Sequence, residues 1–400
     1  MTAFTKLTTT PLLFLSLVSS SESFTSHVGR TFAPLKSAVA EEITIDTSEE
    51  YERQSVRAPL KFNGPYPCLG LTFPNLATQA QIARNVSGVS LDFVLDTAAN
   101  TNTINGQVAQ ALELDIVGQA LPGTGAAGAI AGGATYLVGD CELEGLPKEE
   151  QFTFLQGLTA SALPVASPAA AGLLSMPFFH CFEGGVEFQW GIPTTTDLVP
   201  PPPPSITFYG PGESDAVLEQ MTKVPVKELD ITRLPTVQLT VNGVTIPALL
   251  DTGSPITVIN GPAAKQMKIT ASIDISATTS LPQNNAAKNP LTKLANRFQQ
   301  AQAMAQSAAR GDVLTIAAGA SGERVDLFKS KDQVQVQLVA AAEGDLVDFG
   351  TSHIYIGNLP GLAALDALGD NSPPAAVLGM DVLRLRPKML FKARDQEVYF

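Results

Sequence analysis

The pattern of apolar and polar residues along the chain predicts mainly β-strands. Apolar residues alternate with other residues at Val89–Leu95 and at Val334–Val339, which is typical of strands that bury one face. Gly172–Phe179 is a further apolar stretch, and Ala375–Leu383 is predicted to be a buried turn. Helical spacing occurs at 290–310, where leucine, phenylalanine and alanine side chains fall on one face and Gly311 would end the helix.

One stretch of this pattern occurs twice. Val86–Gly106 reads VSGVSLDFVLDTAANTNTING, and Val241–Gly261 reads VNGVTIPALLDTGSPITVING. The two stretches align without a gap at a constant offset (251 − 96 = 155), and nine of the 21 positions are identical. Internal similarity of this kind indicates two copies of one structural unit. Each copy carries an Asp-Thr pair at the end of an apolar strand.

Length and composition narrow the classes of protein that fit. A chain of 400 residues is too long for one ordinary hydrophobic core, which favours two lobes. The net charge of −13 argues against nucleic acids and anionic membrane surfaces as partners, because both would repel the protein. The three cysteines, Cys68, Cys141 and Cys181, are too few for a disulfide framework, so we expect reduced thiols.

The N-terminal residues have the features of a targeting leader. Residues 1–23 resemble a signal peptide, because Lys6 precedes a short apolar core and small residues follow it. That core is shorter than the roughly 20 residues of a membrane span, so we expect no stable membrane insertion. Residues 24–59 begin with transit-peptide composition and continue as a polar, acidic linker. This order resembles the bipartite leader of algae with complex plastids and implies a plastid location; the alternative is a secreted or endomembrane-lumen protein.

The remaining chain divides at changes in composition. We expect an N-terminal lobe at 60–199, a proline-rich connection at 200–235 and a C-terminal lobe at 236–400. The connection contains five consecutive prolines, which donate no backbone hydrogen bonds and therefore favour an extended link. Residues 262–333 are rich in Ala, Gln, Asn and Ser and are expected to be an insertion. Its basic helix at 290–310 would dock a partner or pack on its own lobe; a partly disordered insertion is the remaining alternative.

The doubled Asp-Thr unit suggests a chemistry. If a pseudo-twofold axis relates the two copies, Asp96 and Asp251 meet at that axis, and two adjacent carboxylates then share a proton. One of them can activate a water molecule while the other protonates a substrate carbonyl, which is acid–base hydrolysis without a metal or cofactor. Thr97 and Thr252 would hydrogen-bond across the axis and brace the loops. Gly253 would let the backbone approach a carboxylate closely.

At these residues the chain resembles the aspartic proteases of the pepsin and retropepsin clan. Ala248–Ser254 is similar to their active-site loop, and Val377–Gly379 is similar to the element that lies behind that loop. The resemblance covers 60–400 apart from the insertion. It implies an all-β, bilobal acid-protease-like fold with two pseudo-twofold-related β-barrel lobes. It also implies a monomeric endopeptidase acting on peptides or unfolded proteins, with the two aspartates as catalytic pair and Tyr136, beside the glycine-rich tract Gly123–Gly133, on a flap.

The first copy departs from the pattern of the family. Ala98 stands where these proteases have glycine in the loop, and Ser175 stands where they have glycine behind it. A misplaced carboxylate loses rate steeply, so an inactive protease-like module that binds peptides or proteins is the alternative function. Asp381 is expected to be a structural carboxylate paired with an arginine.

Overall fold

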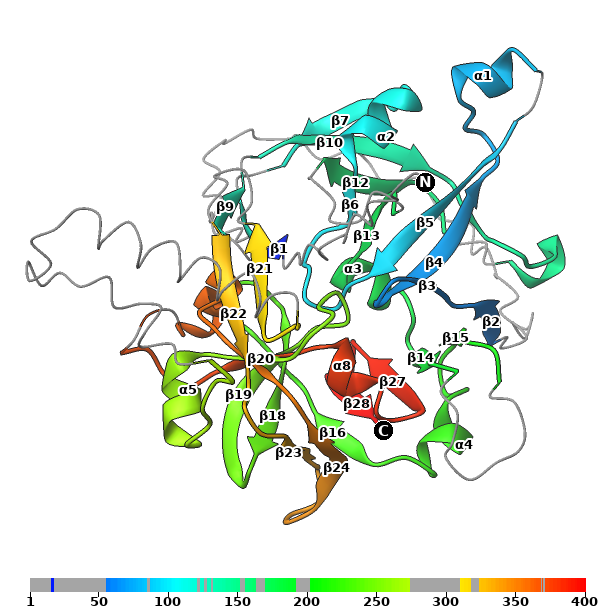
Figure 1. Ribbon diagram of the computed structural model, residues 1–400. Helices are drawn as coiled ribbons and strands as arrows, with labels where there is room; N and C mark the ends of the chain where they lie inside the picture. The colour runs from blue at the N-terminus through cyan, green and yellow to red at the C-terminus, as the bar shows by residue number, and fades with distance from the viewer. Residues whose placement is uncertain are drawn as a thin grey trace, which may run out of the picture.

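The computed structural model describes residues 16–17, 55–84, 87–120, 123–125, 128–130, 132–151, 155–162, 170–191, 202–273, 310–317, 324–367, 369 and 371–400. Regular structure in these residues is mostly β-strand, and their helices have six residues or fewer (Figure 1). No helix among them is long and apolar enough to cross a membrane. The predicted signal segment, apart from the backbone of β1 (Ser16–Leu17), and the predicted helix before Arg310 lie outside the described residues.

The N-terminal lobe is built on one mixed sheet. Its strands follow the order β11-β4-β5-β13-β6-β12-β10-β7, and β3 pairs with β4. These strands are β3 (Lys61–Asn63), β4 (Tyr66–Phe73), β5 (Val89–Leu95), β6 (Thr103–Ile104), β7 (Ile116–Gln119), β10 (Ala134–Gly139), β11 (Glu142–Leu143), β12 (Leu158–Ala162) and β13 (Gly172–Leu174). The short helices of this lobe are α1 (Gln79–Ile82), α2 (Gly106–Ala111), η1 (Lys148–Glu150) and α3 (Met176–Phe179).

The C-terminal lobe is built on a second mixed sheet. Its strands follow the order β21-β22-β25-β20-β26-β19-β18-β23-β24, and β17 pairs with β18. These strands are β17 (Lys227–Glu228), β18 (Pro235–Val241), β19 (Val244–Leu250), β20 (Val258–Ile259), β21 (Val313–Ala317), β22 (Arg324–Lys329), β23 (Val334–Val339), β24 (Leu346–Ser352), β25 (Tyr355–Ile356) and β26 (Ala376–Leu378). The short helices of this lobe are α5 (Gly261–Gln266), η2 (Pro360–Leu365) and α8 (Met380–Leu383).

The two lobes share one strand topology. In the N-terminal lobe β5 runs parallel to β13, which is antiparallel to β6, which is parallel to β12. In the C-terminal lobe β19, β26, β20 and β25 repeat these relations in the same order. The repeated Asn-Gly at the end of each sequence copy starts a helix, because the side chains of Asn105 and Asn260 cap α2 and α5. The fold is therefore the expected all-β, bilobal acid-protease-like architecture.

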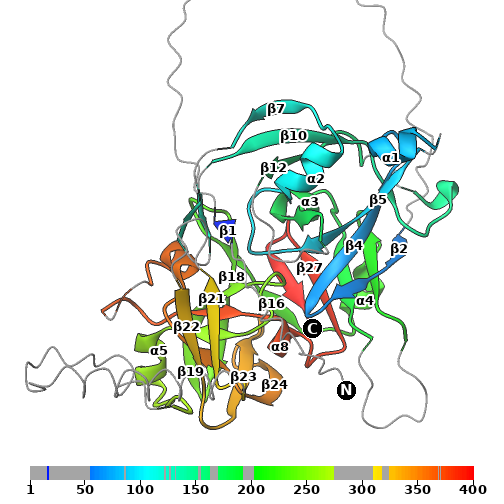
Figure 2. The ribbon, with the colours of Figure 1, turned by 45° about the horizontal axis from the view of Figure 1, so that its top comes forward.

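A further sheet joins the lobes. Its order is β16-β28-β27-β14-β15-β2, and its central pair β14–β27 takes one strand from each half of the chain. Figure 2 shows β27 between the two lobes. The strands are β2 (Val56–Pro59), β14 (Gly185–Gln189), β15 (Ser205–Tyr209), β16 (Lys223–Pro225), β27 (Lys388–Lys392) and β28 (Glu397–Tyr399), with α4 (Asp215–Leu218) beside them. Buried aromatic rings of α3, β14, β15 and β27 pack on one another and tie the halves together.

The structure places several segments differently from the sequence-based boundaries. Residues 56–59, the end of the expected 24–59 linker, form β2, which pairs with β15 and so belongs to the joining sheet. Within the expected insertion at 262–333, α5 is the counterpart of α2, and β21 and β22 form a hairpin at the edge of the C-terminal sheet. Cys68 and Cys141 are buried free thiols and Cys181 is an exposed one.

Candidate active site

Each copy of the repeat delivers one aspartate to the centre of the molecule. Asp96 follows β5 and Asp251 follows β19, and both are fully buried. The Asp96 N–H donates to the Leu174 carbonyl (2.9 Å) and the Asp251 N–H donates to the Leu378 carbonyl (3.0 Å). Because these acceptors lie at the ends of the parallel neighbours β13 and β26, each sheet fixes the backbone of its own aspartate.

The threonines after the aspartates hold the two loops together. The Thr97 hydroxyl donates to the Leu250 carbonyl (2.6 Å), and the Thr252 hydroxyl donates to the Leu95 carbonyl (2.7 Å). Each hydroxyl also accepts the backbone N–H of the other threonine at 3.1 Å. These four bonds cross from lobe to lobe, so the separation of the loops is set by hydrogen bonds rather than by side-chain packing alone.

The two carboxyl groups lie against one another. Burial raises the pKa of Asp96 to about 7, while the Ala98 N–H (2.9 Å from Oδ1) and the Asp251 carboxyl group act in the opposite direction. Burial, and then the charge of Asp96, raise the pKa of Asp251 well above its usual value, while the backbone N–H groups of Gly253 and Ser254 act in the opposite direction. Oδ2 of Asp96 and both carboxyl oxygens of Asp251 are buried and have no hydrogen-bond donor of ordinary geometry among the described residues. Two buried acceptors that face each other in this way are expected to share a proton.

Glycine at position 253 is required by this contact. A Cβ atom added at Gly253 would lie 2.4 Å from Cγ of Asp96 and within 2.7 Å of both its carboxyl oxygens. The loop of the C-terminal lobe can therefore pass directly over the carboxyl group of the N-terminal lobe only while it lacks a side chain.

The opposite loop is not equivalent, because Ala98 keeps its side chain. Ala98 is fully buried and belongs to an apolar cluster whose other members come from the C-terminal lobe, including Leu234 and Val258. Its N–H still donates to Asp96. The structure thus accommodates the methyl group in the interface between lobes.

The residues behind the two loops show how Ser175 is tolerated. The N–H and the hydroxyl of Ser175 both donate to the Asn102 side chain (2.9 and 3.0 Å). At the matching place in the other lobe, the Gly379 N–H donates to the Thr257 hydroxyl (3.0 Å). Asn102 and Thr257 occupy equivalent positions of the repeat, so the larger residue behind the first loop gains a partner that satisfies it.

Asp381 belongs to the same support in the C-terminal lobe. Among the described residues it accepts a hydrogen bond from the Thr257 hydroxyl (2.6 Å), and no arginine pairs with it, contrary to the sequence-based expectation. Burial raises its pKa to about 6, with the Thr257 hydrogen bond opposing the rise. Asp381 therefore braces the loop of Asp251 through Thr257 and lies outside the pair.

Comparison with known proteins agrees with this geometry. Residues 237–299, which include β19 and the Asp251 loop, match the family model described as aspartyl protease. The chain is aspartic-protease-like. No curated protein sequence matches it.

Among solved structures, this protease-like chain is similar to basic 7S globulin from soybean, with 11% identity over 87% of this chain and 95% of that one, at a TM-score of 0.40. It is also similar to conglutin gamma, a basic 7S globulin from lupine seeds, with 10% identity over 87% and 95% of the two chains and a TM-score of 0.40. A structure titled edgp gives 10% identity, 87% and 94% coverage and a TM-score of 0.40.

The glycine-rich tract forms a hairpin next to the C-terminal lobe. Its strands β8 (Gly123–Gly125) and β9 (Gly128–Ile130) pair with each other, and β8 lies near η2. Tyr136 lies on β10, opposite Ala160 of β12, and packs half-buried against the core of the N-terminal lobe. Its role as a flap residue of the protease-like site stays a prediction.

Sequence reasoning missed one residue of the protease-like site. Tyr66, at the start of β4, is buried, and its pKa is raised by burial and then by the charges of Asp251 and Asp96. Its aromatic side chain at the beginning of a strand carried no signal of its own. The pairing of β4 with β5, in which Cys68 lies opposite Val94, brings the start of β4 near the end of β5 that precedes Asp96.

Proposed function

We propose that this protein is an aspartic-type endopeptidase that cleaves peptide or unfolded protein substrates with a water molecule activated by Asp96 and Asp251. The observation that carries the proposal is the contact of these two buried carboxyl groups, one from each lobe, held by crossed threonine hydrogen bonds. Both halves of the site belong to one chain, so a monomer suffices. The chemistry requires no cofactor.

In this mechanism the pair carries one proton. Burial raises the pKa of both carboxyl groups, and the pair loses its first proton as one coupled unit. The ionised carboxylate takes a proton from water while the water oxygen attacks the carbonyl carbon of the substrate. The protonated carboxyl group gives its proton to the carbonyl oxygen. A tetrahedral diol results, and it collapses as a proton passes to the leaving amine.

The test is cleavage of unfolded peptide substrates by the full chain and by the Asp251→Asn variant. We expect measurable turnover for the wild type, inhibition by statine-type mimics of the tetrahedral intermediate, and loss of both turnover and inhibition in the variant. Asp395→Asn is the matched control, because Asp395 pairs with Lys392 on the surface. Turnover that persists in Asp251→Asn would show that another group performs the chemistry.

The second candidate function is binding of peptides without cleavage at the same site. The observation that favours it is the Ala98 methyl group, which occupies the interface between lobes where the other loop has glycine. It predicts peptide binding by the wild type with no turnover between about pH 3 and 8, a range that spans titration of the pair. Turnover that disappears with either aspartate would eliminate it.

A further inference from the structure

Continuing the register of the β4–β5 pair relates Tyr66 to Asp96. Strands β4 and β5 are antiparallel, with Cys68 opposite Val94. Continuing this register by two residues places Tyr66 opposite Asp96. Residues in such a position carry their side chains on the same face, with Cβ atoms about 5 Å apart. The phenol therefore starts from the face of the sheet that carries the first aspartate.

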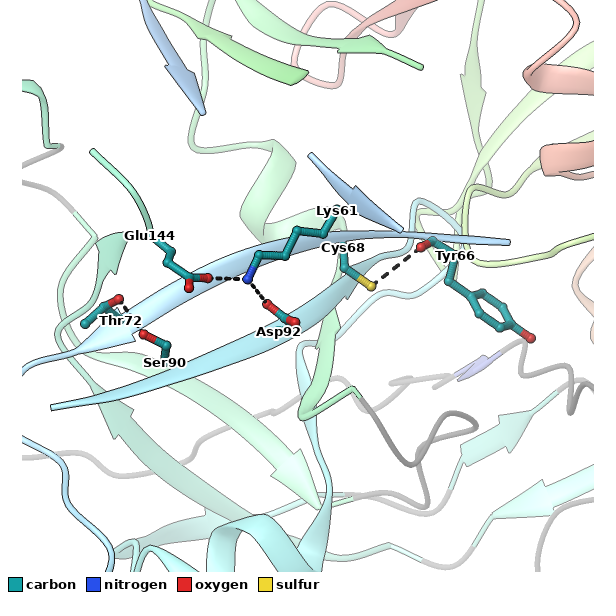
Figure 3. A network of polar contacts seen from close by, with 7 residues as sticks. All are labelled: Lys61, Tyr66, Cys68, Thr72, Ser90, Asp92 and Glu144. Carbon is teal, nitrogen blue, oxygen red and sulfur yellow. Dashed lines mark hydrogen bonds and ion pairs between the residues drawn. The ribbon is translucent and has the colours of Figure 1, made fainter. Parts of the chain in front are cut away.

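Packing fixes the ring in this place. Tyr66 is 7% exposed and clusters with Cys68, Val94 and Leu173, which lie on the same face of β4, β5 and β13. Figure 3 shows the ion pairs of Lys61 with Asp92 and Glu144, and the Tyr66 ring points away from them. The ring is thus held by apolar neighbours at the end of the strand pair nearest the aspartates.

The charges of both aspartates act on the Tyr66 hydroxyl. Besides burial, the charges of Asp251 and Asp96 raise the pKa of Tyr66, and Asp251 contributes more than Asp96. Both carboxyl groups of the pair therefore act on this one phenol. The raised pKa also keeps the phenol protonated, so it remains a hydrogen-bond donor at every pH where the pair titrates.

The other lobe has hydrocarbon at the matching position. Strands β18 and β19 pair with Thr236 opposite Leu249, and the same continuation places Leu234 opposite Asp251. Leu234 is fully buried in the apolar cluster that contains Ala98. A hydroxyl donor is therefore present on one side of the pseudo-twofold axis and absent at the equivalent place on the other side.

We propose that Tyr66 is a positioning residue of the Asp96–Asp251 pair, whose phenol O–H stabilises the singly ionised pair from the N-terminal lobe. This inference rests on the proposed function and deepens it. A donor dipole favours the charged form of a neighbouring carboxyl group and lowers its pKa. Loss of the hydroxyl should therefore raise the pH at which the pair first ionises, and with it the acidic limb of the pH–rate profile.

The first test is Tyr66→Phe, which keeps the ring and removes the hydroxyl. We expect kcat to fall about tenfold with KM nearly unchanged, and the acidic limb to move up by about one pH unit, because one pKa unit corresponds to a tenfold change. Tyr66→Leu, which copies Leu234, should show the same shift. Tyr209→Phe is the control: that tyrosine is also partly buried with a raised pKa, but its hydroxyl bonds to Glu187.

A second measurement does not depend on activity or on the stability of these variants. 3-Fluorotyrosine placed at position 66 keeps both ring and hydroxyl, and its ¹⁹F resonance should report the ionisation of the pair as a step in the pH titration. The step should disappear or move in Asp251→Asn. The same label at position 209 should show no such step.

The outcomes separate the two proposals. If the wild type cleaves peptides and Tyr66→Phe has an unchanged kcat and pH profile, the inference about Tyr66 is wrong and the proposed function stands. If the wild type never cleaves, the proposed function is wrong, and the ¹⁹F titration still decides whether the phenol senses the pair. A flat ¹⁹F titration at position 66 overturns the inference in either case.

Discussion

Replacing Gly253 by alanine tests the contact on which the proposed active site depends. The added Cβ would lie 2.4 Å from Cγ of Asp96, whereas ordinary contact begins at 3.4 Å, so the carboxyl group or the loop must move by about 1.0 Å. Neither can yield easily, because Asp96 is fully buried and the loop is tied across the interface by Thr252. A displacement of about 1 Å in catalytic geometry costs on the order of a hundredfold in rate.

The assay is kcat/KM for an unfolded peptide substrate, together with thermal unfolding of the same preparations. Gly253→Ala should lose about a hundredfold in kcat/KM while it remains folded. Gly261→Ala is the matched control, because a Cβ at that position in α5 would meet nothing within 4 Å. If Gly253→Ala retains activity within a factor of about three of the wild type, the assignment of Gly253 as the point of close approach to Asp96 is refuted.

Three further predictions follow from the same contacts. Burial raises the pKa of Asp96 to about 7, so the folded protein favours the protonated carboxyl group more than the unfolded chain does. The resulting contribution to the free energy of unfolding is complete below about pH 4 and is lost as the pH rises through about 7. Thermal unfolding from pH 4 to 8 should therefore show a fall in Tm, and Asp96→Asn should show a smaller one. Asn260 caps α5 and also donates to two carbonyl oxygens, so Asn260→Ala should lose about 3 kcal/mol of unfolding free energy. Asn105→Ala removes only a cap and should lose about 1 kcal/mol. Urea titration measures both losses. Thr252→Ser should retain activity because it keeps the hydroxyl, whereas Thr252→Val should lose both activity and about 1–3 kcal/mol of unfolding free energy. Equal losses in the two variants would contradict the hydrogen-bond argument.

The sequence revealed the parts of the site that the two copies share. Asp96 and Asp251 were found because both follow an apolar strand at the same place in the repeat, and a strand end is a local property. Asn105 and Asn260 recur for the same reason, since capping depends on the residues immediately following the cap. Local pattern and fold agree at these positions.

The parts that escaped prediction depend on pairing between distant segments. Tyr66 comes opposite Asp96 only when the register of β4 and β5 is continued past Cys68 and Val94, and the lengths of the strands do not determine that register. The hairpin of β21 and β22 was assigned to an insertion because its flanking residues are polar and alanine-rich. The hairpin belongs to the sheet because β22 pairs with β25, a contact between segments distant in the sequence.

The differences between the two copies explain how a nearly symmetric pair can hold two unlike carboxyl groups. Identical halves would give both aspartates the same surroundings until a substrate arrived. Here backbone N–H groups reach both carboxyl groups, from Ala98 to Asp96 and from Gly253 and Ser254 to Asp251. The side chains differ, because the strand next to Asp96 begins with Tyr66 and the matching place in the other lobe holds Leu234. A hydroxyl donor favours a charged carboxyl group and hydrocarbon disfavours one, so this single exchange makes the surroundings of the coupled pair asymmetric. The Tyr66→Leu variant removes that asymmetry and therefore tests whether it shifts the titration of the pair.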